Sequence, residues 1–243
     1  MSALFIKEIN GFFSSLTGYI VMAVFLLING LFLWVFPLQF NIPDFGYASL
    51  RNLFMLAPVV FLFLIPAITM KMFAEEKRSG TIEMLLTRPL TELQIILAKY
   101  FAAILLVIFS LLPTLIYAVS VYLLGSPRGN IDMGGMWGSY LGLIFLASGF
   151  VAIGIFCSSL TSNQIVSFVA SISLCGFLYI GFEFIYSLEL FGRFDLLIQS
   201  LGIHRHFQSM SRGVIDSRDV IYFLSLTALF ILLTKISLES RKW

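Results

Sequence analysis

The densest group of ionisable side chains in this 243-residue chain lies between positions 71 and 99. This segment reads KMFAEEKRSGTIEMLLTRPLTELQIILAK and carries acidic and basic residues in close succession. Mixed charges of this kind can pair with another protein surface, where they set the orientation of binding more than its strength. The segment therefore predicts a docking surface for a partner. A solvated hairpin tip, whose charges only fix the topology, is the alternative.

Helix-terminating signals divide this charged segment. Gly80 predicts the end of the helix that enters it, because glycine readily adopts the left-handed conformation at a helix C-terminus. Thr81 can cap a new short helix, which ends before Pro89 because a proline ring disfavours helix in the preceding residue. Residues 91–94 match a capping box and start the next long helix with a defined entry angle. The sequence thus predicts a short transverse helix braced between two long ones.

The short predicted helix has an apolar side formed by Ile82, Leu85 and Leu86, with Glu83 exposed. A helix of two turns at most is marginal alone in water. We therefore expect its apolar side chains to be buried in a groove of a partner, with the surrounding charges forming the rim of the contact. The residues assigned to this docking surface are Glu75, Glu76, Lys77, Arg78, Gly80, Thr81, Ile82, Glu83, Leu85, Leu86, Arg88 and Pro89.

Few other side chains suggest chemistry, and no catalytic set is predicted. His204 and His206 flank an arginine and do not share a helical face, so we expect no metal site there. Cys157 and Cys175 lie in strongly apolar runs, which predicts two buried thiols and neither a disulfide nor a zinc site. Glu183 lies in an apolar stretch, where an ionisable group is a functional candidate. Its place near the outer end of that stretch favours contact with water.

The elements that hold these side chains must be membrane helices. Hydrophobic residues make up 59% of the chain and charged residues 12%, whereas soluble domains average about 45–50% and about 25%. The net charge of +2 provides no basic field for nucleic acid. We therefore predict an all-α polytopic membrane protein with six transmembrane helices. The predicted spans are 18–36, 53–72, 92–124, 136–157, 164–186 and 220–238.

Three further segments complete the predicted single transmembrane domain, 1–243. Residues 1–17 have an apolar face and a polar face, as expected for an interfacial helix. Residues 73–91 form the cytoplasmic coupling segment. The connector 187–219 is expected outside the cytoplasm as an interfacial or re-entrant helix, because each of its arginines would cost about 2.5–3.5 kcal/mol at the bilayer centre. Most of the 15 lysines and arginines then lie on the side of the two termini, which places both termini in the cytoplasm.

Small residues in the fourth predicted span indicate close helix packing. Gly138 and Gly142 form a G-x-x-x-G step, and Gly149 and Gly154 lie further along the same span. Such glycines let helix backbones approach closely. The partner helix could belong to this chain or to a second membrane subunit.

The charged segment resembles the cytoplasmic connector of ABC-2-type membrane subunits, the exporter permeases. The residues that match this pattern are Phe73, Glu75, Arg78, Gly80, Thr81, Glu83, Leu85, Leu86, Pro89 and Lys99. The resemblance extends over most of the chain, including the SSLTSNQ turn at 158–164 and the segment 206–223. Within the family, the whole sequence is most similar to permeases associated with gliding motility.

The resemblance implies a transporter permease subunit rather than an enzyme. It implies that a separate cytoplasmic ABC ATPase, in two copies, docks on the short helix. It also implies a second membrane subunit, with a different chain favoured over a second copy, in the cytoplasmic (inner) membrane of a bacterium. We expect no cofactor on this chain, which lacks a G-x-x-x-x-G-K-[ST] run. ATP and Mg²⁺ would bind to the ATPase.

Other functions stay open at this point. An ABC-2 exporter of lipid, polysaccharide or drug unrelated to gliding would have similar spans. An ATP-driven mechanical anchor that moves no substrate would also look alike. An ion-coupled secondary transporter would need ion pairs in the membrane and repeated halves with broken helices. An intramembrane enzyme would need polar groups clustered at one depth, and neither pattern is evident.

Overall fold

The computed structural model describes residues 1–86, 90–189, 192 and 195–240, and all regular structure in these residues is helical. Six helical stretches of the described residues are long and apolar enough to cross a membrane, which confirms the predicted all-α fold with six spans. These stretches are Gly18–Val35, Arg51–Arg78, Glu92–Leu124, Met133–Leu160, Gln164–Ser187 and Ser217–Glu239.

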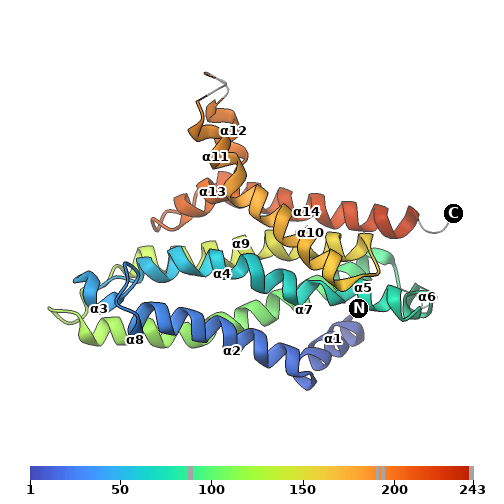
Figure 1. The fold of residues 1–243 in the computed structure, drawn as a ribbon, viewed down its shortest axis with the longest axis horizontal. Helices are drawn as coiled ribbons and strands as arrows, with labels where there is room; N and C mark the ends of the chain where they lie inside the picture. Colours follow the sequence, from blue (N-terminus) through green and yellow to red (C-terminus); the bar gives the residue numbers. More distant parts are fainter. Residues whose placement is uncertain (87–89, 190–191, 193–194, 241–243) are drawn as a thin grey trace.

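The six spans do not contribute equally to the core. In the second, third and fourth spans, 67%, 61% and 72% of the most apolar stretch is buried inside the chain, against 28%, 22% and 22% in the first, fifth and sixth. Helix α9 (Met133–Leu160) packs against helices of the second, third, fifth and sixth spans. The bundle is elongated, with most helices running along its long axis (Figure 1). The outer faces of the peripheral spans are left to lipid or to another chain.

The chain begins with two helices joined at an angle. Helix α1 (Ser2–Ser14) ends where Ser15 takes an extended conformation, and α2 (Leu16–Gly30) follows. Helix α1 contacts the third span and buries Leu4, while Lys7, Asn10 and Ser14 on its other side are exposed. A single π-helical turn, η1 (Leu31–Val35), extends α2, and the short α3 (Ile42–Phe45) follows.

The second span runs beyond its apolar part into the charged segment. Helix α4 (Arg51–Thr69) continues through Met70 into α5 (Lys71–Arg78). Helix α5 ends where Gly80 adopts a φ of +70°, which confirms the predicted termination. The short helix α6 (Thr81–Leu86) comes next. Figure 1 shows α6 at the same end of the bundle as α1 and the end of the last helix, opposite to α3.

The third span begins with α7 (Glu92–Leu111), where Thr91 and Gln94 form the predicted capping box. A 3-10 turn that contains Pro113, η2 (Leu112–Thr114), separates α7 from α8 (Leu115–Leu124). Proline cannot donate the hydrogen bond that a continuous helix requires, which accounts for the interruption.

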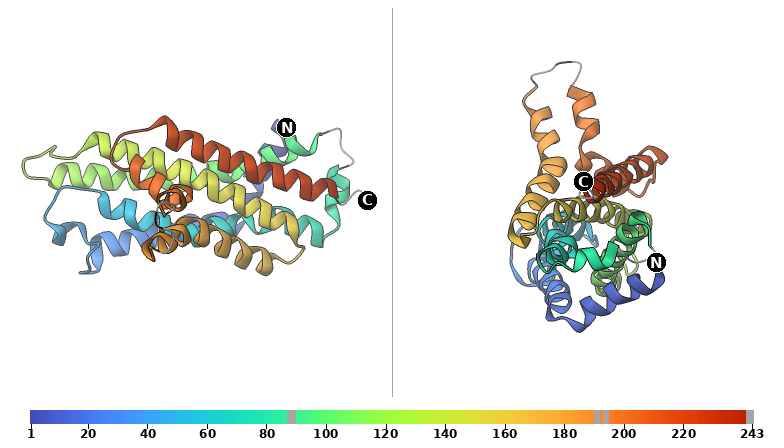
Figure 2. Two further views of the ribbon diagram at one scale, coloured as in Figure 1. Left: turned by 90° about the horizontal axis from the view of Figure 1, so that it is seen from above. Right: turned by 90° about the vertical axis from the view of Figure 1, so that its right-hand side faces the viewer.

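The fifth span, predicted over 164–186, is present but is not one continuous α-helix. It consists of α10 (Gln164–Gly176), the π-helical turn η3 (Phe177–Gly181) and α11 (Phe182–Ser187). Beyond η3 the chain leaves the direction of the bundle, and α11 pairs with α12 (Asp195–Leu201) in a hairpin that projects sideways (Figure 2). A wide π-helical turn is a common place for a helix to change direction.

The described part of the connector therefore holds two α-helices, where a single one was expected. Helix α12 is followed by α13 (Ile203–Met210), which packs on α9, and then by the last span, α14 (Ser217–Glu239). Leu190, Phe194, Leu197 and Leu201 are spaced as one apolar stripe of a helix, and of these Leu197 and Leu201 are exposed, at 61% and 56%. Leu190 and Phe194 lie outside the described residues.

Candidate functional site

The charged segment forms a projection from the second span that we call the foot, residues 71–86, comprising α5 and α6. Its outer surface carries the charges of Glu75, Arg78 and Glu83, whose side chains are exposed. None of these three forms a salt bridge with another described residue. These side chains are available to a partner surface.

The turn between α5 and α6 is closed by local hydrogen bonds. The amide of Ser79 donates to the carbonyl of Glu75 at 2.9 Å, and the amide of Gly80 donates to the carbonyl of Lys77 at 3.4 Å. The hydroxyls of Ser79 and Thr81 lie 2.8 Å apart. These bonds satisfy groups that a helix end leaves unpaired, so α6 follows α5 without a flexible linker.

Ile82 corrects part of the expected apolar surface. The side chain of Ile82 is only 8% exposed and belongs to the hydrophobic core of this chain. It therefore cannot be buried in a partner's groove as predicted. Leu85 and Leu86 lie in α6, and the structure describes their backbone only. Arg88 and Pro89, also assigned to the docking surface, lie outside the described residues.

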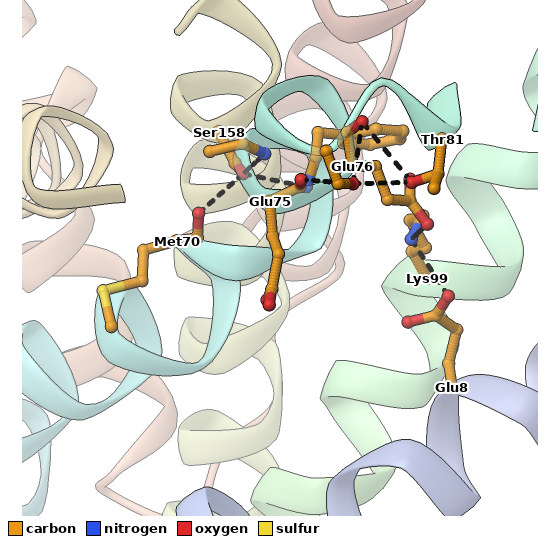
Figure 3. A network of polar contacts seen from close by, with 10 residues as sticks. Glu8, Met70, Glu75, Glu76, Thr81, Lys99 and Ser158 are labelled. Carbon is orange, nitrogen blue, oxygen red and sulfur yellow. Dashed lines mark hydrogen bonds and ion pairs between the residues drawn. The ribbon is translucent and has the colours of Figure 1, made fainter. Parts of the chain in front are cut away.

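Glu76 also departs from the expected rim of charges. Its carboxylate lies 2.8 Å from the ammonium of Lys99 on α7, and the same ammonium lies 2.9 Å from Glu8 on α1. Lys99 is 1% exposed, and its ammonium stands 5.2 Å from the centre of the Phe73 ring. Figure 3 shows the two carboxylates reaching Lys99 from different helices. We call Glu8, Glu76 and Lys99 the buried triad.

The buried triad joins three elements that are far apart in sequence. The single Lys99 ammonium balances the charge of only one of the two carboxylates. Removing Lys99 would therefore leave two negative charges in a largely buried site. Breaking a buried ion pair by deleting one partner costs about 3–5 kcal/mol. The foot is thereby held to α1 and α7 together. Sequence reasoning used Lys99 only as part of a motif and missed its pairing with Glu8, which is 91 residues away.

A serine on α9 caps the start of the foot. The hydroxyl of Ser158 accepts hydrogen bonds from the amides of Phe73 and Ala74 at 3.0 and 3.1 Å, and it donates to the carbonyl of Met70 at 3.0 Å (Figure 3). These amides belong to the first turn of α5, where a helix has no internal acceptors. A residue of the fourth span thus takes the place of an N-cap.

Lys77 extends the connection to the end of α9. Its ammonium donates to the carbonyl of Ser159, and the hydroxyl of Ser237 on α14 donates to the same carbonyl at 3.2 Å. Lys77 therefore faces the bundle, whereas it was expected among the charges at the rim of the contact with a partner. Polar contacts consequently fix the foot to helix α1 and to the third and fourth spans, and through Ser159 to the sixth.

The four glycines singled out in the sequence, Gly138, Gly142, Gly149 and Gly154, all face other segments of this chain. A Cβ atom at Gly138 would lie 2.7 Å from the Cα of Gly213, and one at Gly142 would lie 3.3 Å from the Met210 side chain. The contacts of the other two glycines follow the same pattern: Gly149 faces Leu226 of α14, and Gly154 faces Thr69 of α4. The sequence left open whether these glycines pack against this chain or against a second membrane subunit. In the structure they pack against other segments of the same chain.

The two histidines lie apart, each beside an acidic residue. His204 Nε2 is 3.4 Å from Glu183, whose side chain is about half exposed. His206 Nδ1 lies 2.6 Å from Asp219, and its Nε2 lies 2.8 Å from the carbonyl of Ser200. The pairing of His206 with the start of α14 was missed because it depends on the turn that follows α13. The described residues contain no group of three potential metal ligands.

Both cysteines are buried and unpaired in the structure, Cys157 at 3% and Cys175 at 0% exposure. Neither therefore forms a disulfide, as predicted from the apolar runs around them.

Comparison with known proteins identifies the family. No curated protein matches the chain. The family described as "ABC-2 family transporter protein" matches residues 2–238, which include all six spans and the foot. Because this match covers nearly the whole chain, the protein belongs to the ABC-2 family of transporter proteins and is a multi-pass membrane permease subunit.

Proposed function

We propose that the foot receives the motion of a separate cytoplasmic ABC ATPase and passes it to the membrane spans. The buried triad is the observation that carries this proposal. A force on α5 acts on Lys99 through Glu76, and separating the two would leave the Glu76 carboxylate, which is only 16% exposed, without its cation. Moving α5, α7 and α1 together avoids that cost. An ATPase that pushes on the foot would therefore shift the third span and the interfacial helix with it.

The exposed surface of the foot is the proposed contact with the ATPase. Glu75, Arg78 and Glu83 would orient the partner, because exposed charges at an interface mainly affect association and register. We propose Leu85 and Leu86 as the apolar anchors of this contact. ATP and Mg²⁺ would bind to the ATPase, which we expect in two copies.

We further propose that the complex resides in the inner membrane of a bacterium, with the foot and both termini in the cytoplasm. The shared position of α1, α6 and the end of α14 at one end of the bundle supports this arrangement (Figure 1). The open faces of the first, fifth and sixth spans leave room for a second membrane subunit, which we expect to be a different chain. The resemblance to gliding-motility permeases supports a role in that machinery.

Co-purification from the native host, followed by ATPase assays in lipid nanodiscs, tests this function. The Glu75→Lys, Arg78→Glu, Glu83→Lys triple variant should lose most of the associated ATPase, and so should Leu85→Asp with Leu86→Asp. Glu239→Lys, at an exposed site on α14, is the control and should retain the ATPase. If both foot variants keep the ATPase at wild-type levels, the foot is not the docking surface.

The role of the triad needs a separate measurement. Lys99→Met should keep the ATPase bound, because Lys99 is not on the surface, but should uncouple nucleotide-dependent movement of α7 from the foot. In the wild type, spin labels on α6 and α7 should keep the same separation when nucleotide is added, because the two helices move together, whereas in Lys99→Met that separation should change. An unchanged response in Lys99→Met would contradict the proposed path.

A further inference from the structure

A cavity of about 560 Å³ opens at the end of the bundle opposite to the foot. Its walls come from the start of α4, the start of α9, the turn η3 and helix α13. This volume lies within the range of about 300–1,000 Å³ that small-molecule sites occupy. The foot and the buried triad contribute no residue to it, so it is a separate site.

The cavity is lined by two kinds of surface. Apolar surface comes from Phe54, Met55 and Phe207. Met55 is 53% exposed, so this apolar part of the wall reaches the outer surface of the chain. Arg51, the first residue of α4, and Arg212, in the turn after α13, also line the cavity, and each carries a guanidinium group. A site with an apolar part beside a cationic part suits a molecule that has both an alkyl chain and an anionic group.

The two arginines are not neutralised by the protein. Neither forms a salt bridge with another described residue. The carboxylate of Asp132, which also lines the cavity, accepts the amide hydrogen bond of Gly135 at 2.9 Å and so serves as the N-cap of α9. Two arginines and one aspartate line the cavity, so the positive charges of its lining residues exceed the negative one. Guanidinium groups bind phosphate and carboxylate groups through paired hydrogen bonds.

The backbone on both sides of Arg212 is held in place. Gly213 approaches Gly138 so closely that a Cβ atom on Gly138 would lie 2.7 Å from its Cα. The carbonyl of Ser211 accepts from the hydroxyl of Ser139 at 3.1 Å. The close packing allowed by glycine in the fourth span thus builds one wall of the cavity.

The start of α4 is held in a similar way. Asn52, which follows Arg51, is 4% exposed, and its side-chain amide donates to the carbonyl of Phe40 at 3.1 Å. Both arginines therefore extend from an anchored backbone. A preformed site loses less entropy when a ligand binds.

We propose that this cavity binds an amphiphile with an anionic headgroup, with Arg51 and Arg212 holding the headgroup and the chain lying along Phe54, Met55 and Phe207. Binding at this site does not require the ATPase. The proposal therefore stands or falls independently of the docking surface on the foot.

A photocrosslinking experiment in phosphatidylcholine nanodiscs tests the proposal. The probe is a dodecyl phosphate that carries a diazirine at the end of its chain, and mass spectrometry maps the modified residues. We expect modification around Phe54, Met55 and Phe207, and competition by unlabelled dodecyl phosphate. Dodecanol and inorganic phosphate should each compete at least tenfold less well, because each lacks half of the recognised structure.

Matched variants identify the cationic part of the site. Arg51→Gln with Arg212→Gln should reduce modification of the cavity at least tenfold. Arg51→Lys with Arg212→Lys should retain part of it, since the charge remains. Arg218→Gln changes an exposed arginine that does not line the cavity, and it should behave as wild type. If the glutamine variant fails to elute as a folded protein, the lysine variant and the competition series decide the question.

Three outcomes would overturn the proposal. Equal competition by inorganic phosphate would indicate a site for a free anion, and equal competition by dodecanol would indicate an apolar pocket without charge recognition. Modification spread evenly over the lipid-facing surface, or unchanged modification in a folded glutamine variant, would show that the cavity does not bind the probe.

Discussion

The ammonium of Lys99 lies 2.8 Å from the carboxylate of Glu76, which joins the middle of the foot to the third span. The bond is short and its lysine is buried, so it differs from a surface ion pair that water would weaken. With Glu8 on the other side of the same ammonium, it makes the foot, α1 and α7 a single mechanical unit. The stability of this unit can be measured.

Lys99→Met should destabilise the protein strongly, because it leaves Glu8 and Glu76 without their cation. We expect a loss of about 3–5 kcal/mol, the range for breaking a buried ion pair. Thermal unfolding in detergent would show a lowered midpoint. Lys235→Met is the matched control, because Lys235 pairs with Glu239 at 3.4 Å on the exposed surface of α14. Its loss should cost at most about 0.5 kcal/mol.

Removing the stranded charges should restore part of the stability. The variant Lys99→Met with Glu8→Gln and Glu76→Gln leaves no ionised member of the triad, so it should unfold at a higher temperature than Lys99→Met alone. A triple variant no more stable than the single variant would show that packing around Lys99, and not its charge, holds the foot.

Ser158→Ala should loosen the start of the foot. The substitution leaves the amides of Phe73 and Ala74 without the hydroxyl that caps them, at a cost of about 1–3 kcal/mol. Hydrogen exchange at these two amides should accelerate. Ser120→Ala is the control, since its hydroxyl is exposed and bonds only to its own helix at Ile116. Unchanged exchange at 73 and 74 would contradict the capping role.

Gly154→Ala should separate the second and fourth spans. Its added methyl group would meet the side chain of Thr69, which is fully buried on α4, with the Thr69 Cβ at 2.8 Å. Overpacking of this kind typically costs about 1–3 kcal/mol. Gly176→Ala meets no atom within 4 Å and should be neutral or stabilising. Equal unfolding midpoints for the two variants would indicate that α4 and α9 are not in such close contact.

Cysteine labelling tests the orientation. In a background of Cys157→Ala and Cys175→Ala, a membrane-impermeant maleimide should label Tyr47→Cys in intact cells. All three sites are exposed, but Glu83 belongs to α6 and Ser240 follows α14, and both of these elements reach the end of the bundle that carries the foot, so Glu83→Cys and Ser240→Cys should react only after the cells are permeabilised. Labelling of Glu83→Cys in intact cells would place the foot outside the cytoplasm.

Local signals in the sequence predicted much of the fold. Runs of apolar residues are long enough to identify each span without knowledge of its neighbours. The end of α5 at Gly80 and the capping box at Thr91 depend on residues at most four positions apart. Such features follow from short-range chemistry, and the structure has them where they were predicted.

The contacts that fix the foot were not predictable in this way. Lys99 and Glu8 meet because α1 packs on α7, and Ser158 caps α5 because α9 crosses the second span. The inward turn of Ile82 likewise depends on the core that surrounds it. A periodic pattern shows which residues share a face, but it does not show what lies opposite that face.

The uneven burial of the spans has a consequence for biosynthesis. The three most buried spans, Arg51–Arg78, Glu92–Leu124 and Met133–Leu160, follow one another directly in the chain. They can assemble as soon as the ribosome has released residue 160, because their mutual contacts require nothing that is synthesised later. Helices α10 and α14 of the last two spans then pack on α9. Packing in the order of translation would shorten the time during which apolar polypeptide is open to misassembly.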